Sequence, residues 1–351
     1  MKKPLTTTLI LSATLLAVLL LLRPYSPHRP PKTLPGGIFV GSLPEIGDVI
    51  LSCWQLDDTL SGAILRTTTP GRMPLEGRAP RTGKFGLTFH PDADGDEATA
   101  WRLVGDTLQD PDLLTGILSI PGSKHDYPVS LSRIGSYSAI HAKSGIRVFG
   151  RGLTRNYHAA VPSLHQNHPA EAMVSSLFLA KAKGLAADFT DTTMSEIWDS
   201  ARYGFQSEYE SWDEFELAGI GPGWISVRWM SYQYTGGAHG NWGITGLNWQ
   251  LDPFRPTPIE LHHLFREDSP WVELLSTLCI ESLKTQGASS VVDNSIASFA
   301  AADLNSFTLH QHGLEIHFNP YSVASYAEGA FTVSIPWETV AHLRPPHPVI
   351  P

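Results

Sequence analysis

The sequence predicts an α+β protein built in two parts. The first is an N-terminal all-β meander that closes into a barrel or a sandwich, and the second is a C-terminal α+β domain in which an antiparallel sheet packs against helices. Short apolar runs separated by turn residues fill residues 36–133, and from about residue 168 helical spacing alternates with strand alternation. The 30 glycines and 27 prolines favour short strands and turns over long helices. We therefore divide the folded part into an all-β domain at 36–133 and an α+β domain at 134–345.

The first residues predict a membrane segment that is not part of a fold. No charged residue occurs between Lys3 and Arg23, and this interval contains the apolar run Leu9–Leu22. As a helix, the whole uncharged interval would be roughly 28 Å long, which is enough to cross the core of a bilayer. We interpret residues 1–23 as a signal anchor or signal peptide and favour the uncleaved anchor, because no small-x-small cleavage site follows. Residues 24–35 form a proline-rich spacer.

This leader implies a location. The basic end of such a segment stays inside the cell, so everything after residue 23 is expected to be extracytoplasmic, in a bacterial periplasm or at the cell surface. The net charge of -9 argues against a nucleic-acid partner, which would require a basic stripe. Cys53 and Cys279 lie far apart in the sequence, and we expect two separate buried thiols and no cysteine-based metal site.

Glycines recur in the all-β part, where a strand is expected to bend or to pack closely against its neighbour. They close the apolar runs at Gly62, Gly77, Gly105 and Gly116. The acidic stretch Asp92–Glu97 invites a calcium-loop reading, but its spacing is truncated and we expect a plain turn.

The C-terminal part combines helices and strands. Residues 169–189 and 270–286 have helical spacing, each beginning at a proline, and the acidic run Glu208–Glu216 is read as a solvated helix face. Strand alternation or short apolar runs mark the remaining elements: 223–234, 244–251, a hairpin at 307–318 and a closing strand at 331–337.

Four motifs in a fixed order carry a family resemblance: Tyr234–Asn241 "YTGGAHGN", Ile259–Phe265 "IELHHLF", Gly313–Gly329 "GLEIHFNPYSVASYAEG" and Phe331–Trp337 "FTVSIPW". The set resembles the C-terminal domain of RsiV-type anti-sigma factors, which also occurs in PdaC-type polysaccharide deacetylases of the cell envelope and is largely a domain of unknown function. The resemblance covers residues 222–340 best.

The resemblance implies an extracytoplasmic binding or scaffolding domain. Its partner would be a protein, lysozyme-like by analogy with the anti-sigma factors, or peptidoglycan or another glycan. Three differences from these relatives limit how much of their function can be expected here. Only Met1–Lys3 would remain in the cytoplasm to meet a sigma factor, no deacetylase domain is present, and Ser325 stands where family members often carry proline. We therefore do not expect lysozyme sensing with sigma-factor release.

The loop after the strand 223–234 is the candidate site. It can be a structural hairpin, a binding lip, or a catalytic or metal site. In the binding reading His239 is a polar handle, Tyr234 and Trp242 are flat walls, Gly236 and Gly237 permit positive φ, and Gly240 permits close backbone approach. The candidate ligand-binding residues are Tyr234, Gly236, Gly237, His239, Trp242, Tyr321 and Tyr326.

Catalytic motifs are missing from the sequence. There is no GxSxG and no HExxH, and the histidines at 239, 262, 263, 310, 312 and 317 give no metal-ligand spacing. We assign no catalytic residue, metal or cofactor. The leading hypothesis is a non-catalytic envelope protein that binds a protein or glycan, and the alternative is an envelope hydrolase or metal-dependent enzyme centred on His239.

Overall fold

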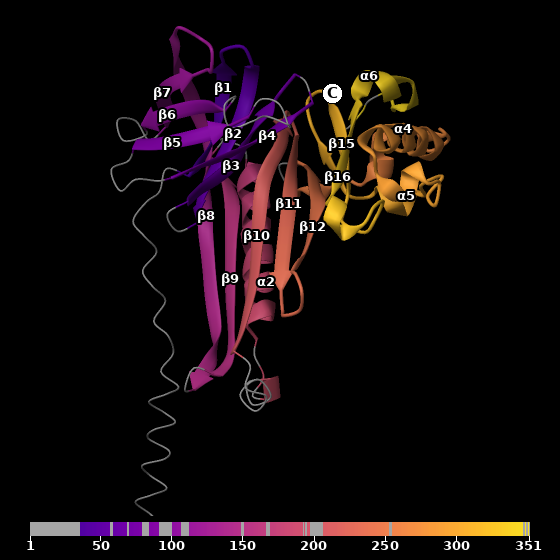
Figure 1. The fold of residues 1–351 in the computed structure, drawn as a ribbon. Coiled ribbons are helices and arrows are strands. Elements are labelled where there is room, and N and C mark those ends of the chain that lie inside the picture. Colours follow the sequence, from indigo (N-terminus) through magenta and orange to yellow (C-terminus); the bar gives the residue numbers. More distant parts are fainter. Residues whose placement is uncertain are drawn as a thin grey trace, which may run out of the picture. The chain divides into compact units, whose positions relative to one another are not determined.

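The computed structural model describes residues 36–350 apart from gaps at 57–58, 69, 79–83, 91–99, 107–111, 149–150, 166–168, 192, 194, 197–205, 253–254, 347 and 349. The expected leader 1–23, spacer 24–35 and calcium-like stretch Asp92–Glu97 lie outside the described residues. The described residues form two sheets and several helices (Figure 1).

The first eight strands form a closed barrel. Each pairs antiparallel with the next, and β1 also pairs with β8, so the barrel alternative is confirmed over the sandwich. Their bounds are β1 Gly37–Leu43, β2 Gly47–Leu56, β3 Thr59–Arg66, β4 Arg72–Arg78, β5 Lys84–Phe89, β6 Trp101–Asp106, β7 Leu113–Ser119 and β8 Asp126–Val148.

Apolar side chains fill the barrel, and glycines let its strands approach. Phe39, Leu51 and Leu103 are buried inside it. A Cβ at Gly62 would lie 2.0 Å from the carbonyl oxygen of Ser52, and one at Gly116 would lie 2.5 Å from that of Val104. The predicted close packing at these glycines is confirmed.

Strand β8 belongs to both halves of the chain. Residues 126–132 pair with β7, whereas residues 135–148 pair with β9 Arg151–Leu164. The predicted domain boundary at 133/134 therefore falls inside one continuous strand. The sheet continues from the barrel through β9, β10 Gln206–Gly221, β11 Trp224–Tyr234, β12 Asn241–Gln250 and β13 Thr257–Pro258.

One face of this extension is covered by helix α2, Pro169–Thr190, which connects the parallel strands β9 and β10. The helix was predicted, with Pro169 at its start. Val174 and Phe178 of α2 pack in one core with Phe215 and Val227 of the strands. In Figure 1, α2 lies behind β10 and β11, and the opposite face of these strands is in view.

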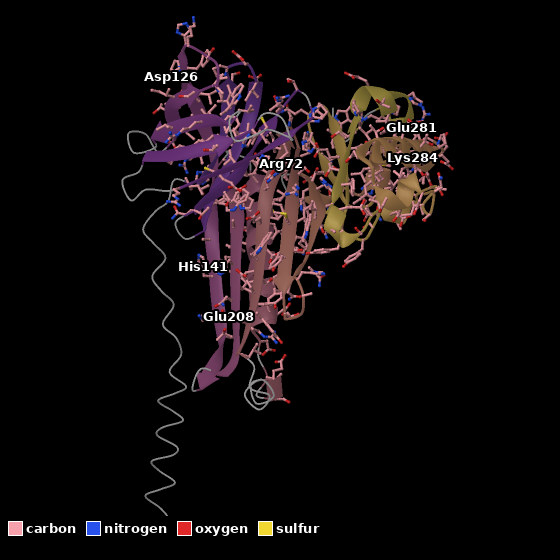
Figure 2. The ribbon with its side chains drawn as sticks, in the orientation of Figure 1. Arg72, Asp126, His141, Glu208, Glu281 and Lys284 are labelled. Carbon is pink, nitrogen blue, oxygen red and sulfur yellow. The ribbon has the colours of Figure 1, made fainter. Side chains whose placement is uncertain are left out.

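The predicted helical character of the acidic run is wrong. Glu208–Glu216 lies in strand β10, and Asp213 and Glu216 are buried. The signal was present in the sequence, because Glu208, Glu210, Glu214 and Glu216 occupy alternate positions, which is the period of a strand. Figure 2 shows Glu208 on the long strands, well away from Arg72.

The C-terminal segment forms a small antiparallel sheet packed against helices, as predicted. The sheet order is β14-β15-β16, and α4 contributes Leu275, Cys279 and Leu283 to the shared core. Cys53 and Cys279 are both buried and neither forms a disulfide, which confirms two separate thiols. The bounds are η2 Leu261–Leu264, α4 Trp271–Gln286, α5 Ser289–Val292, η3 Ala301–Leu304, β14 Phe307–Leu309, β15 Gly313–Phe318, η4 Tyr326–Glu328, β16 Phe331–Pro336, α6 Trp337–Val340 and η5 Ala341–Leu343.

Within the described part of the chain, no helix combines the length and the apolar character that crossing a bilayer requires. The apolar run Leu9–Leu22, on which the expected anchor depends, lies outside the described residues.

Candidate functional site

The loop between β11 and β12 has the backbone that its glycines predict. Gly236 and Gly237 have φ values of 96° and 99°, a region that side chains rarely adopt. The hydroxyl of Tyr234 donates a hydrogen bond of 3.1 Å to the carbonyl oxygen of Gly237. Tyr234 therefore fastens the loop to the end of its own strand.

A second segment, 86 residues further along the chain, closes on this loop. The rings of His239 and Tyr326 stack with centroids 4.0 Å apart and planes 20° apart. The hydroxyl of Tyr326 also donates a 2.6 Å hydrogen bond to the carbonyl oxygen of Gly240. His239 and Tyr326, both predicted as site residues, thus lie in direct contact.

Tyr321 completes this cluster from an unusual backbone position. The turn Asn319–Ser322 is closed by a 2.9 Å bond from the amide of Ser322 to the carbonyl oxygen of Asn319, and Tyr321 occupies its third position with φ 70°. Glycine or asparagine is the usual residue there after a proline. The residue is 65% exposed, and its ring centroid lies 5.4 Å from that of Tyr326.

Two polar anchors hold this second segment in place. The side-chain oxygen of Asn319 accepts a 2.6 Å hydrogen bond from the amide of Ile244. The side-chain nitrogen of Asn319 donates a 3.2 Å hydrogen bond to the carbonyl oxygen of Ile244. Further on, Glu328 accepts from the hydroxyls of Ser325 and Ser289, each at 2.8 Å. The first anchor ties the turn to β12, and the second ties η4 to the start of α5.

Trp242 lies beside this cluster on the sheet. Trp242 on β12 is paired with Tyr232 on β11, and Tyr232 is paired on its other side with Trp212 on β10. The three side chains therefore share one face of the sheet. The Trp212 and Tyr232 rings stack at 5.2 Å and 11°. A Cβ at Gly240 would lie 2.4 Å from the Tyr232 ring, which confirms the close approach expected there.

The structure therefore brings His239, Tyr321 and Tyr326 together, with Tyr234 and Trp242 at the adjoining strand ends. We call these five residues, with Gly236 and Gly237, the loop surface. Sequence reasoning missed Asn319, Tyr232 and Trp212 as its supports. The dipeptide Asn319-Pro320 is a turn signal, and Tyr232 alternates with Tyr234, so both left traces in the sequence.

The chemistry open to His239 is that of a polar contact. Within the described chain its ring makes one polar contact, a 2.9 Å bond from Nδ1 to the carbonyl oxygen of Gly240. Because a carbonyl only accepts, Nδ1 carries the proton in this arrangement and Nε2 presents a lone pair. Among the described residues, no carboxylate is hydrogen-bonded to the ring as in a Ser-His-Asp triad.

The described residues place no metal-binding group of histidines around His239. His262 lies 3.4 Å from the carboxylate of Glu260, and Nδ1 of His263 accepts from the Glu260 amide at 3.0 Å. Across the described ranges no group of three or more histidine, cysteine or acidic side chains is placed to hold a metal ion.

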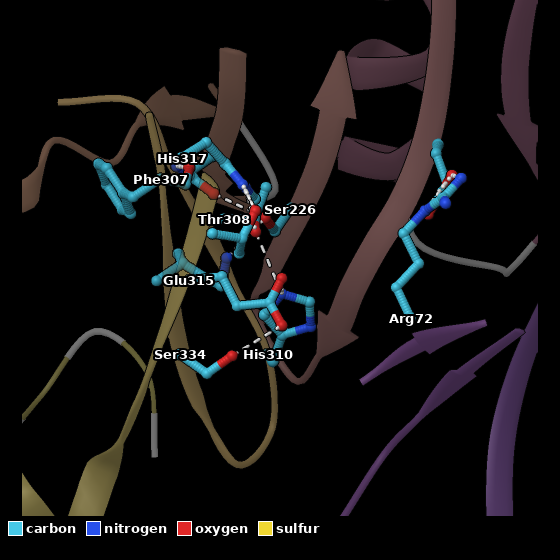
Figure 3. A network of polar contacts seen from close by, with 12 residues as sticks. Arg72, Ser226, Phe307, Thr308, His310, Glu315, His317 and Ser334 are labelled. Atoms are coloured by element: carbon cyan, nitrogen blue, oxygen red, sulfur yellow. Dashed lines mark hydrogen bonds and ion pairs between the residues drawn. The ribbon is translucent and has the colours of Figure 1, made fainter. Parts of the chain in front are cut away.

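A second polar cluster lies buried under the small sheet (Figure 3). The Thr308 hydroxyl lies 3.1 Å from Nε2 of His310 and 3.0 Å from Nε2 of His317, while Glu315 lies 3.2 Å from the same Nε2 of His310. A catalytic relay needs its acid on the other ring nitrogen. Thr308 is also fully buried, so this cluster has a structural geometry.

Burial determines the charge states in this cluster. It lowers the pKa of His317 to about 3, and the nearby Arg228 charge adds to the effect. Burial alone would raise the pKa of Glu315, but the charge and hydrogen bond of His310 outweigh it and lower the value to about 2. At neutral pH the cluster therefore holds a neutral His317 beside an ionised Glu315.

Beside this cluster, an ion pair ties the barrel to the part of the same sheet that extends beyond it. Nη2 of Arg72 on β4 lies 2.7 Å from Oε2 of Glu216 on β10, and its Nε lies 2.9 Å from Oε1. Burial would raise the pKa of Glu216, but the attraction and hydrogen bonds of Arg72 lower it overall. Figures 2 and 3 show Arg72 on the barrel side of this contact.

Comparison with known proteins finds one family match. Residues 262–338 match a family model described as "Protein of unknown function (DUF3298)". The match includes Tyr321 and Tyr326 and begins after His239. None of the curated proteins compared with the chain matches it.

Two solved structures of the same family are similar to the chain. One is from Pseudomonas aeruginosa PAO1, with 12% identity, a TM-score of 0.45, and coverage of 62% of this chain and 97% of that chain. The other is a DUF3298 family member from Bacteroides fragilis NCTC 9343, with 18% identity, a TM-score of 0.40, and coverage of 60% and 94%.

Proposed function

We propose that this protein is a non-catalytic, extracytoplasmic binding protein of the bacterial envelope. Its N-terminal segment anchors it to the membrane, and the loop surface holds a protein or a cell-wall glycan. The likeness of its four motifs to the RsiV-type domain supports a binding role. Support from geometry comes from Tyr321, in the DUF3298 domain, together with His239 from the hairpin before it.

The conformation of Tyr321 is the observation that carries the proposal. A non-glycine residue in the left-handed region costs about 1 kcal/mol or more, and such strain clusters at binding sites. Here the strained residue is 65% exposed and lies outside the buried apolar core. The chain thus keeps an unfavourable backbone to present an aromatic side chain to solvent, next to the stacked His239 and Tyr326.

The substitution Tyr321→Gly tests this directly, because it relieves the backbone while it removes the ring. A binding role predicts that the free energy of unfolding stays equal or rises and that capture of envelope components falls. Purified wild type and variant, coupled to a resin, would be incubated with envelope extracts that contain both proteins and sheared peptidoglycan. Bound material would be quantified by mass spectrometry and by sugar analysis.

Glu45→Gly is the matched control. Glu45 also has positive φ, at 62°, but lies in the turn between β1 and β2. It should leave capture unchanged. Equal capture by the wild type and by Tyr321→Gly would reject the loop surface as the binding site.

A further inference from the structure

An open pocket borders the turn that presents Tyr321. It has a volume of about 470 Å³, within the roughly 300–1,000 Å³ range of small-molecule sites. Its lining comes from the segments 296–306 and 317–322, so Asn319 and Ser322 of the turn form part of its wall. One turn therefore serves both the pocket and the loop surface.

The pocket combines an apolar base with polar groups. Phe299 and Phe318 both line it, with ring centroids 4.8 Å apart, and both are largely buried. Ser298, Asp303 and Ser322 line it as exposed polar residues. The base is fixed by the core, and the polar groups stand at the opening.

Several of these polar groups keep hydrogen-bonding capacity. One carboxylate oxygen of Asp303 accepts a 2.8 Å bond from the amide of Ala300, which leaves the other for a ligand. The side-chain oxygen and one N–H of Asn319 are hydrogen-bonded to Ile244, so the second N–H is available to a ligand. The lining thus offers an acceptor on Asp303 and a donor on Asn319, together with an apolar base.

Charge narrows the ligand class. Asp303 is the single acidic residue of the lining, which contains no lysine or arginine. Phosphate and carboxylate ligands would meet a negative charge with no cation to offset it. A neutral ring that carries several hydroxyl groups and an apolar face matches both the polar groups and the base.

We propose that this pocket binds one neutral pyranose residue of a glycan chain, and that the chain continues over the turn to Tyr321. This inference rests on the proposed binding function and makes its ligand a glycan. The exposed Tyr321 ring offers a flat surface on which the next sugar residue stacks.

The experiment uses soluble probes on the purified extracytoplasmic part of the chain, residues 24–351. A tetramer of N-acetylglucosamine and a tetramer of glucose are titrated by calorimetry and by ligand-observed NMR, with inorganic phosphate as the charged comparison. We expect at least one tetramer to bind and phosphate to give no signal. Binding of neither tetramer overturns the inference.

Two tryptophan substitutions locate the site. Ala302→Trp places a bulky ring in the pocket lining and is expected to weaken tetramer binding at least tenfold, whereas Ala297→Trp adds the same ring to an exposed alanine outside the lining and should not. Equal binding by the two variants overturns the pocket. Asp303→Asn, which retains an acceptor for the Ala300 amide, provides a milder second variant, expected to weaken binding severalfold.

The envelope capture experiment separates the two proposals. If the wild type captures an envelope protein in a Tyr321-dependent manner while no tetramer binds, the glycan inference fails and the binding function stands. If neither capture nor tetramer binding depends on Tyr321, the proposed function fails as well.

Discussion

The side chain of Asn319 pairs with both backbone groups of Ile244, accepting from its amide at 2.6 Å and donating to its carbonyl at 3.2 Å. An asparagine amide has the same donor and acceptor as a peptide unit, so Asn319 acts as one additional residue of strand pairing at β12. This contact aligns Tyr321 and Tyr326 with the hairpin that carries His239.

Replacing Asn319 by alanine should therefore loosen the second segment of the loop surface. Loss of the two bonds is expected to cost about 1–3 kcal/mol of unfolding free energy. Hydrogen exchange at residues 319–329 should accelerate, as measured by mass spectrometry. Asn305→Ala, at an exposed asparagine, should change neither quantity; unchanged exchange in Asn319→Ala would show that other contacts hold the turn.

The ion pair between Arg72 and Glu216 gives a second prediction. Arg72→Met leaves a buried carboxylate without its partner and should cost roughly 3–5 kcal/mol in urea unfolding. The double variant Arg72→Met with Glu216→Leu removes both charges and should recover much of this loss. A double variant that is as unstable as the single one would mean that the contact acts mainly through packing.

A third prediction concerns pH. The pKa of His317 is about 3 in the folded chain, below its ordinary value of 6.5, so the unfolded chain binds the proton first as pH falls. The stability that this residue contributes is present above pH 6.5 and is lost as pH falls toward 3. Glu315, with a pKa of about 2, adds a loss in the same direction below pH 4.5.

His317→Gln should flatten this dependence. Between pH 7 and pH 5 the unfolding free energy of the wild type should fall by about 2 kcal/mol more than that of the variant. Urea unfolding followed by tryptophan fluorescence at both pH values measures the difference. His262→Gln, at an exposed histidine, serves as control, and an equally steep loss in His317→Gln would assign the effect to other groups.

Asp213 is the subject of a fourth prediction. Its two carboxylate oxygens accept from the hydroxyl of Tyr157 at 2.6 Å and from the indole nitrogen of Trp229 at 2.7 Å. Asp213→Ala leaves both donors without an acceptor and should lower the free energy of unfolding by about 2–4 kcal/mol. Asp213→Asn keeps one acceptor and should lower it less. Thermal unfolding of the two variants gives the order, and equal stability would contradict this account.

Much of the fold was predictable because it depends on local patterns. Alternation identified β11, a proline and a four-residue apolar repeat identified α4, and recurrent glycines marked the close strand contacts of the barrel. Strand β10 was missed because the acidic run Glu208–Glu216 was interpreted as a helix face, although its acids occupy alternate positions. The parallel pairing of β9 with β10 is non-local and leaves no comparable pattern.

The candidate site was predictable in its residues but not in its assembly. The motif likeness brought His239, Tyr321 and Tyr326 to attention, and the structure places them in contact. Their contact depends on Asn319 reaching β12, a relation between residues 75 positions apart that no local periodicity encodes. The pocket beyond the turn is likewise made by segments that meet only after folding.

The uninterrupted course of β8 has a mechanical consequence. The strand that closes the barrel continues without interruption into the part of the sheet that carries Trp212 and Tyr232. A pull applied near Gly36, where the chain enters β1 beside β8, would be transmitted along hydrogen-bonded strands and not absorbed by a linker. Cutting the gene at codon 133 would sever this strand, so neither half is expected to persist as an independent fragment.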